Sequence, residues 1–216
     1  MRQVPDYAKS GSGGYSSDKE KEMATTKTKV GRLLISGREL FICDNFIDPE
    51  MVAAIGADLK TMPFARKEKS RPGVSGLASS ADIDAALLPR DPFFLRLRAI
   101  AEKMFPGEAL HDQRAYVNSA ISSDSYYIHR DSPEDSNDVT VLYYANLIWK
   151  PDWGGETIFY KDDHDAVLAV TPRAGRLVIS RGAILHRGSV PTHDCHEARL
   201  TIAYKLRSDG PRSSGT

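Results

Sequence analysis

Residues 114–131 read RAYVNSAISSDSYYIHRD, and the character of the chain changes there. From Arg114 onward, short runs rich in β-branched and aromatic residues alternate with Gly, Pro, Asp and Ser. Runs of this kind, bounded by turn residues, are typical of strands in an antiparallel β protein. The pattern predicts about eight strands, over residues 115–121, 126–129, 139–147, 156–160, 167–170, 176–179, 183–186 and 199–206. It favours a sandwich or jelly roll.

Two helices are predicted upstream of this segment. Asp48 is a suitable N-cap and Pro49 fits the first helical position, so a helix should start there and end near residues 62–63. A second helix is expected over residues 92–104, with Pro106-Gly107 stopping it. The predicted fold class is therefore mainly β with flanking helices (α+β). It is a double-stranded β-helix, or jelly roll, with two N-terminal helices.

The remaining upstream segments are short. The apolar runs 32–36 and 39–42 are interpreted as strands or a hairpin. Residues 65–80 are polar, contain glycine and lack periodicity, which predicts a loop that is either a lid or disordered.

Composition predicts one domain with a tail at each end. The chain has 216 residues and 41% hydrophobic content, enough for one domain with a sizeable core. Residues 1–28 have almost no aliphatic side chains and are predicted to be a flexible N-terminal tail. Residues 29–208 would form the domain, with its β-helix core at 114–206, and residues 209–216 a flexible C-terminal tail.

Several functional classes are disfavoured by the composition. The net charge is +0 and no basic stripe is present, so no nucleic-acid partner is expected. No apolar run approaches the roughly 20 residues of a membrane span, and we expect no membrane partner. The two cysteines form no disulfide framework, and the N-terminus lacks a signal-peptide pattern. We therefore expect a cytoplasmic protein, whose oligomeric state the sequence leaves unknown.

The most informative short motif is His129-Arg130-Asp131. Residues two apart on a strand face the same side, so one imidazole and one carboxylate could bind the same ion. His186, at the end of a later apolar run, is the candidate third ligand of a 2-His-1-carboxylate iron(II) site. A chain with 6 histidines gives roughly half an H-x-D match by chance. Order and context raise the odds here, because this match is the only one in the chain.

A second candidate is Arg199, at the start of the last predicted strand. If its guanidinium points inward, it would need an anion, because an uncompensated buried charge costs several kcal/mol. A carboxylate gripped by two parallel hydrogen bonds would satisfy it. The alternative is an ordinary surface arginine.

Taken together, these motifs resemble the prolyl-4-hydroxylase-like branch of the Fe(II)/2-oxoglutarate dioxygenases. The matching segments, in order, are FICDNFI (41–47), HRDSP (129–133), VLYYAN (141–146), WGGET (153–157), PRAGRLV (172–178), His186, and Arg199 with Thr201. The resemblance implies iron(II), 2-oxoglutarate and O2 as cofactors, with ascorbate as a candidate reductant. It implies that His129, Asp131 and His186 bind iron and carry the catalysis.

The resemblance also implies cosubstrate contacts. Arg199 would bind the distal carboxylate of 2-oxoglutarate, and Tyr144 would add a hydrogen bond. Where the family often has a tyrosine, this chain has Ser119, so Tyr116 or Asn118 would take over that part of the pocket. Residues 193–197, HDCHE, form an unusually long connection that could be mistaken for a zinc cluster, but no second ligand pair lies nearby in the sequence.

The expected function is a 2-oxoglutarate- and O2-dependent hydroxylase that releases succinate and CO2. Asp131 favours hydroxylation, because halide-transferring relatives lack this carboxylate. A small molecule, such as an amino acid or natural-product intermediate, is expected as the substrate in preference to a peptide. The alternatives are a prolyl residue hydroxylase acting on a peptide or protein, a non-catalytic jelly roll that binds a ligand or metal, and a cupin with another metal.

Overall fold

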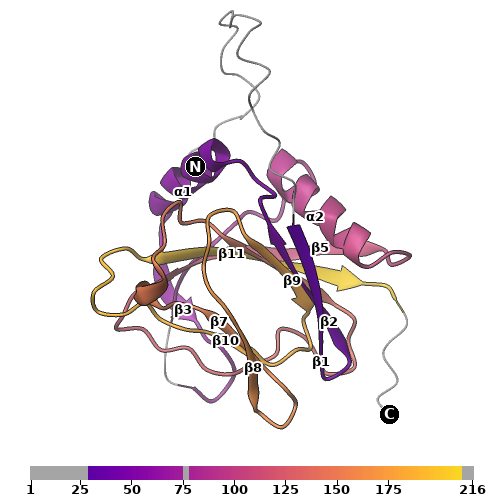
Figure 1. Ribbon diagram of the computed structural model, residues 1–216. Helices are drawn as coiled ribbons and strands as arrows, with labels where there is room; N and C mark the ends of the chain where they lie inside the picture. The colour runs from indigo at the N-terminus through magenta and orange to yellow at the C-terminus, as the bar shows by residue number, and fades with distance from the viewer. Residues whose placement is uncertain (1–28, 75–77, 211–216) are drawn as a thin grey trace, which may run out of the picture.

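The computed structural model describes residues 29–74 and 78–210. The predicted tail at 1–28 lies outside the described residues, as do residues 211–216 of the predicted C-terminal tail. Two antiparallel sheets and two helices make up the fold (Figure 1). The elements are β1 (Lys29–Ile35), β2 (Arg38–Asp44), α1 (Pro49–Lys60), β3 (Ala65–Glu68), β4 (Ala78–Asp82), α2 (Pro92–Met104), β5 (Leu110–Ala120), β6 (Val139–Tyr144), a 3-10 turn η1 (Pro151–Trp153), β7 (Thr157–Tyr160), β8 (Ala166–Val170), β9 (Leu177–Arg181), β10 (His186–Gly188) and β11 (Arg199–Ser208).

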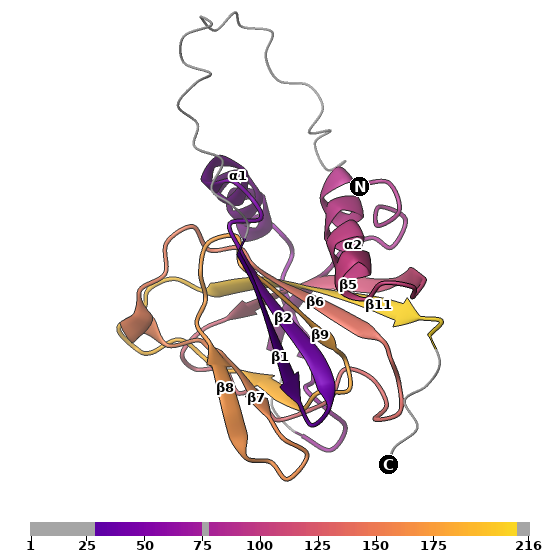
Figure 2. The same cartoon turned by 45° about the vertical axis from the view of Figure 1, so that its right-hand side comes forward.

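The large sheet has eight strands in the order β1-β2-β9-β6-β11-β5-β4-β3, and the small sheet has three in the order β10-β7-β8. Both helices cover the face of the large sheet that is turned away from the small one (Figure 2). Each helix starts at an aspartate whose side chain accepts a 2.8 Å hydrogen bond from a backbone N–H, Met51 for Asp48 and Phe93 for Asp91. These caps satisfy donors that the first turn leaves free. Neither described helix is long and apolar enough to cross a membrane.

Strand β11 separates the core from a cavity between the sheets. Its even-numbered residues Leu200, Ile202 and Tyr204 are buried in the main core beneath the helices. Its odd-numbered residues Arg199 and Thr201 line the cavity on the opposite face. Because side chains alternate along a strand, one sequence supplies an apolar core face and a polar inner face.

The region expected to be a loop, residues 65–80, contains two strands instead. Strands β3 and β4 pair with each other, and β4 extends the large sheet by pairing with β5. The small residues of β4 give no apolar period-two signal, yet Ala78 and Ser80 are buried. Residues 75–77 lie outside the described part of the chain. The lid prediction is therefore corrected over 65–68 and 78–80, which belong to the edge of the sheet.

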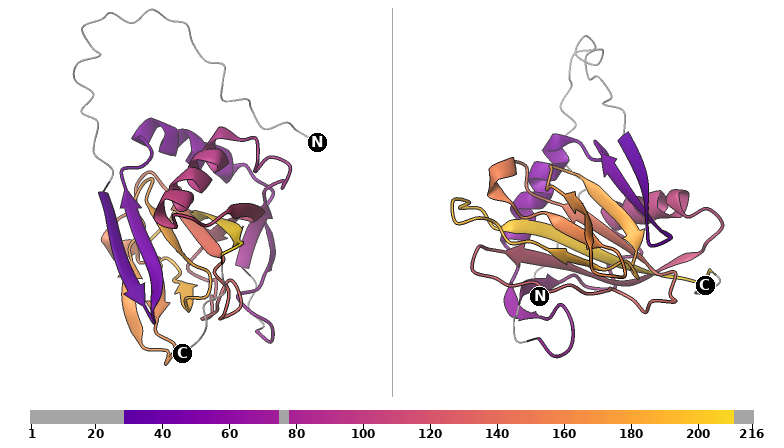
Figure 3. Two further views of the ribbon diagram at one scale, coloured as in Figure 1. Left: turned by 90° about the vertical axis from the view of Figure 1, so that its right-hand side faces the viewer. Right: turned by 60° about the horizontal axis from the view of Figure 1, so that its bottom comes forward.

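Most other predicted strands are present with shifted ends. The two N-terminal runs form the hairpin β1–β2, at the other edge of the large sheet (Figure 3). The predicted strand 126–129 is reduced to a single bridge from His129 to His186. The predicted strand 183–186 begins only at His186. Both differences arise beside the cavity, which Tyr126, His129 and His186 line.

Candidate metal centre

Three potential ligands converge in the cavity between the sheets. His129, Asp131 and His186 each offer one ligand atom, and these atoms all lie within 4.8 Å of one another. Their side chains are 18%, 6% and 16% exposed, so each is shielded but reachable. The structure thus brings together the three residues that the sequence singled out.

The main chain holds the two histidines together. The amide of His129 donates to the carbonyl of His186 at 2.9 Å, and the amide of His186 donates back at 3.0 Å. The amide of Asp131 donates to the carbonyl of Gly182 at 2.8 Å. Pairing between distant segments therefore fixes all three backbones before any metal binds.

The ring orientation of each histidine leaves Nε2 available. Nδ1 of His129 lies 2.9 Å from the carbonyl of Tyr127, and Nδ1 of His186 lies 3.0 Å from the carbonyl of Ile184. A carbonyl only accepts, so each Nδ1 carries the proton. The lone pair of each Nε2 then faces Asp131, at 3.4 and 3.5 Å from its carboxylate oxygens. This second contact on Nδ1 is the usual way a protein fixes the tautomer of a metal-binding histidine.

The electrostatics favour the protonation states that a metal requires. Burial lowers the pKa of His186 to about 4, against the opposing charge of Asp131. Burial alone would raise the pKa of Asp131, but the charge of Lys205, helped by the neighbouring imidazoles, outweighs it and holds that pKa well below its usual range. A neutral imidazole and an ionised carboxylate are the forms that bind divalent metals.

Lys205 is a residue of this site that sequence reasoning missed. Its ammonium contacts Oδ2 of Asp131, which also accepts a 2.7 Å hydrogen bond from the hydroxyl of Thr140. The missed signal was periodicity, because Lys205 lies in phase with Arg199 and Thr201 on one strand.

Arg199 points inward, next to a set of unpaired polar atoms. It is 4% exposed, and its Nη2 donates to Oγ1 of Thr157 at 2.8 Å. Three buried atoms that line the same cavity have no hydrogen-bond partner: Nε of Arg199, Oγ1 of Thr201 and the hydroxyl of Tyr126. Buried polar atoms are nearly always paired, so a cluster of orphans indicates a missing polar ligand. A carboxylate offers acceptors for donors of this kind, as the distal end of 2-oxoglutarate would.

Of the other residues predicted to contact the cosubstrate, some line the cavity and some do not. Tyr116 and Asn118 line the cavity, whereas Ser119 points to the opposite face of β5. Tyr144 is absent from the cavity wall, because its hydroxyl already donates to Oγ1 of Thr157 at 2.7 Å and contacts the carbonyl of Val170 at 3.3 Å. Its ring lies 5.2 Å from the guanidinium of Arg199. The direct contact of Tyr144 with the cosubstrate stays a prediction; its hydroxyl reaches Thr157, which also accepts from Arg199.

The HDCHE connection shows no zinc site. Its Glu197 pairs with Lys60 of α1 at 3.0 Å, and the Cys195 thiol contacts the carbonyl of Glu197 at 3.2 Å. Within residues 29–74 and 78–210, the one group of three clustered His, Cys, Asp or Glu ligands is the His129 group.

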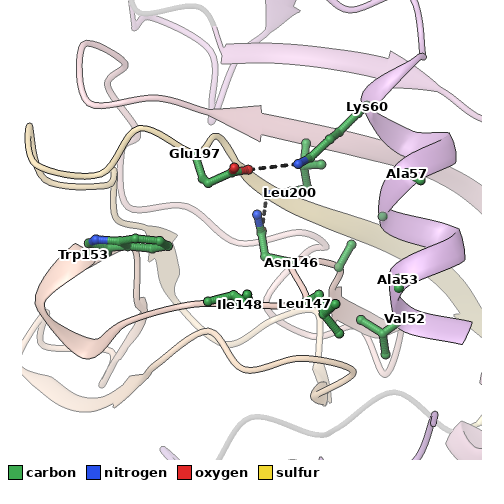
Figure 4. Close-up of a pocket in the computed structure, with 12 residues that line it drawn as sticks. Val52, Ala53, Ala57, Lys60, Asn146, Leu147, Ile148, Trp153, Glu197 and Leu200 are labelled. Atoms are coloured by element: carbon green, nitrogen blue, oxygen red, sulfur yellow. Dashed lines mark hydrogen bonds and ion pairs between the residues drawn. The ribbon is translucent and has the colours of Figure 1, made fainter. Parts of the chain in front are cut away.

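Further cavities lie outside the centre. The first, which we call the outer chamber, measures about 460 Å³ and shares Tyr116, Asn118, Tyr126, His129, Asp131 and Lys205 with the metal cavity. The second measures about 360 Å³ and lies between α1, Ile148 and Trp153 (Figure 4). It is largely apolar and shares no lining residue with the metal cavity. A third cavity, of about 570 Å³, is lined by His129 but not by Asp131 or His186. The outer chamber is thus the cavity that adjoins two of the candidate metal ligands, His129 and Asp131.

Comparison with protein families gives one match. Residues 115–206 match the model of the 2OG-Fe(II) oxygenase superfamily. This segment contains His129, Asp131, His186 and Arg199. No curated protein sequence matches the chain.

Solved structures share the fold at low sequence identity. A prolyl-4-hydroxylase from Pseudomonas putida superposes with a TM-score of 0.57 at 20% identity, covering 78% of this chain and 92% of the other. A prolyl hydroxylase from Trichoplax adhaerens, in complex with a hypoxia inducible factor peptide fragment, gives 0.56 at 18% identity, covering 78% and 83%. The epimerase SnoN, in complex with Fe3+, alpha ketoglutarate and nogalamycin RO, gives 0.58 at 16% identity, covering 78% of each chain. At these identities, the likeness concerns the fold.

Proposed function

We propose that this chain, an Fe(II)- and 2-oxoglutarate-dependent oxygenase by the match of residues 115–206, hydroxylates a C–H bond of a small molecule and releases succinate and CO2. The observation that carries the proposal is the convergence of two imidazoles and one carboxylate next to unpaired buried donors. We also infer that the two facing sheets form the double-stranded β-helix of this class.

In this proposal, His129, Asp131 and His186 bind iron(II). Two imidazoles and one carboxylate leave coordination positions for 2-oxoglutarate and O2. When bound, these cofactors supply the oxidation of the C–H bond, and the protein supplies orientation and shielding. Thr140 donates to one carboxylate oxygen of Asp131, Oδ2, so the other oxygen is left for the metal.

The chain's own donors orient the cosubstrate. Arg199 offers its guanidinium to the distal carboxylate, and Thr201 and Tyr126 add hydroxyl donors. Thr157 already accepts from Arg199 and Tyr144, so its own proton is free to point into the cavity. Tyr116 and Asn118 line the side toward the outer chamber.

The size of the outer chamber supports a small-molecule substrate. Its volume of about 460 Å³ lies within the range of small-molecule sites, roughly 300–1,000 Å³. Similar folds include prolyl hydroxylases, so a prolyl residue in a peptide is the second candidate. A screen of free amino acids, small organic acids and proline-containing peptides for stimulated succinate release distinguishes the small-molecule substrate from the peptide substrate. If only the peptides stimulate succinate release, a peptide substrate would replace the small-molecule proposal.

The enzymatic proposal is tested by adding iron(II) and 2-oxoglutarate without oxygen. The wild-type protein should develop the weak visible charge-transfer band of the chelate. Replacing His129, Asp131 or His186 by Ala should abolish the band and 2-oxoglutarate turnover while the circular dichroism spectrum stays unchanged. Absence of the band in the wild type would favour a non-catalytic jelly roll or a cupin. Succinate release retained in all three variants would contradict the assigned ligands.

A further inference from the structure

Lys205 is a buried cation beside the proposed iron ligands. Its side chain is 14% exposed, its ammonium contacts Oδ2 of Asp131, and it lies 3.3 Å from the hydroxyl of Thr140. Among the described residues, Asp131 is the one carboxylate that forms an ion pair with Lys205. Removing the partner of a buried charge is strongly destabilising, so the identity of that partner matters.

When iron(II) and 2-oxoglutarate are bound, the positive charge of Lys205 has no negative charge to balance it; this step rests on the proposed function. The two positive charges of iron(II) are balanced by Asp131 and by the chelating carboxylate of 2-oxoglutarate. The distal carboxylate is balanced by Arg199. The charge of Lys205 is then in excess, and one negative charge is missing near it.

The cosubstrate's distal carboxylate cannot serve both cations. Arg199 and Lys205 lie on the same extended strand, where a rise of about 3.3 Å per residue places their Cα atoms about 20 Å apart. Lys205 lies at the Asp131 end and lines the outer chamber, whereas Arg199 does not line that chamber. The missing charge therefore belongs to a different molecule, on the chamber side of the metal ligands.

The other charged groups of the chamber wall are mostly paired. Arg114 pairs with Glu68 and with Asp82, each at 3.0 Å. Arg130 pairs with Asp162 at 3.1 Å and donates to the carbonyl of Ala183 at 2.6 Å.

Lys69 is the exception at the chamber rim. It is exposed and forms no ion pair with any described residue. The charge left over in the outer chamber is therefore positive, from Lys205 inside and Lys69 at the rim.

We propose that the outer chamber binds a small organic anion as substrate, with a carboxylate or similar acidic group that pairs with Lys205 once the metal engages Asp131. The polar and aromatic wall formed by Tyr116, Asn118 and Tyr126 contacts the rest of the molecule. Lys205 is then a specificity-determining residue, because it rejects neutral and cationic analogues at the same place.

The test uses manganese(II)-loaded protein with 2-oxoglutarate, titrated with benzoate and with benzamide. These two probes share a shape and differ in charge. Relaxation of their ring protons by the paramagnetic ion gives both an affinity and proximity to the metal. The wild type should bind benzoate at least tenfold more tightly than benzamide. Lys205→Met should abolish that preference, and Lys205→Arg should keep it.

Two controls complete the design. Lys103→Met, on the exposed side of α2, should leave benzoate affinity unchanged. Metal-free wild type should bind benzoate more weakly, because Asp131 then occupies Lys205. Equal affinity for the two probes, no benzoate binding, or benzoate affinity unchanged in Lys205→Met would each overturn the inference. The iron(II) and 2-oxoglutarate band, measured on the same wild-type sample, separates this failure from failure of the proposed enzymatic function.

Discussion

Arg199 of the large sheet donates a 2.8 Å hydrogen bond to Thr157 of the small sheet. Both residues line the metal cavity, and neither lines the outer chamber. Thr157 also accepts from Tyr144, so two residues from two other strands orient the guanidinium of Arg199. Arg199 is thus held in place before any carboxylate arrives, which lowers the entropy lost on binding.

Arg199→Ala should raise the concentration of 2-oxoglutarate needed for half-saturation by about 100-fold, since hydrogen bonds to charged groups contribute about 1.5–3 kcal/mol each. Titration of the anaerobic iron(II) band measures this directly. Arg207→Ala is the matched control on the same strand, because its side chain is 66% exposed. Unchanged cosubstrate affinity in Arg199→Ala would assign the role to another residue.

Tyr126→Phe should weaken cosubstrate binding, whereas Tyr144→Phe should lower the stability of the fold. Tyr126→Phe removes an unpaired buried hydroxyl, so it should weaken 2-oxoglutarate binding by about fivefold to tenfold, the cost of one hydrogen bond, without loss of stability. Tyr144→Phe breaks a buried hydrogen bond to Thr157 and should lower the free energy of unfolding by about 1 kcal/mol. Urea unfolding and cosubstrate titration of both variants check the pair. The opposite pattern would restore Tyr144 as the direct contact.

Gly155→Ala should impair the cosubstrate site through Arg199. Gly155 has φ +75, and an added Cβ would lie 2.9 Å from the Trp149 ring and 3.1 Å from Cδ of Arg199. The left-handed conformation costs a non-glycine residue about 1–2 kcal/mol. We expect lower thermal stability together with weaker 2-oxoglutarate binding. In Gly31→Ala, the added atom meets nothing within 4 Å, and both quantities should be unchanged.

Glu108 should make stability depend on acid pH. The hydrogen bonds from Arg181 hold the pKa of Glu108 below its ordinary value, although burial opposes them. Its contribution is therefore complete above the unfolded pKa, near 4.5, and is lost as pH falls further. Glu108→Gln should destabilise by about 1–3 kcal/mol at pH 7 and by much less at pH 3. An equal effect of Glu102→Gln, whose side chain is 46% exposed, would contradict this account.

The two thiols should differ in reactivity. Burial, with the charge of Asp44, raises the pKa of Cys43 to about 11, and its side chain is 0% exposed. Cys195 is partly exposed on its loop. At pH 8, a disulfide reagent should modify one thiol quickly and the second only after unfolding. Cys195→Ser should eliminate the fast phase; two fast phases in the wild type would show that β2 opens readily.

The candidate metal ligands were predictable because their signal is local or ordered along the chain. The spacing of His129 and Asp131 follows from strand geometry, and His186 ends an apolar run. What the sequence could not show is that the backbones of His129 and His186 pair directly, since pairing between distant segments depends on the whole sheet. Tyr126 was missed for a related reason, because its segment was predicted as a strand and forms none in the structure.

Other omissions have different physical causes. Strand β4 contains Ala, Ser and Asp, so its buried positions carry no hydrophobic pattern. The sequence does indicate that Lys205 faces the same side of its strand as Arg199, because the two residues are an even number of positions apart. A lysine in a strand, however, is usually interpreted as an exposed side chain.

The reciprocal hydrogen bonds between His129 and His186 also bear on biosynthesis. A nascent chain that has emerged only as far as residue 185 contains one imidazole and one carboxylate of the proposed set, with no partner strand to hold them. Two groups without fixed backbones make only a weak metal site, so the proposed site is complete once residue 186 has been made and has paired with residue 129.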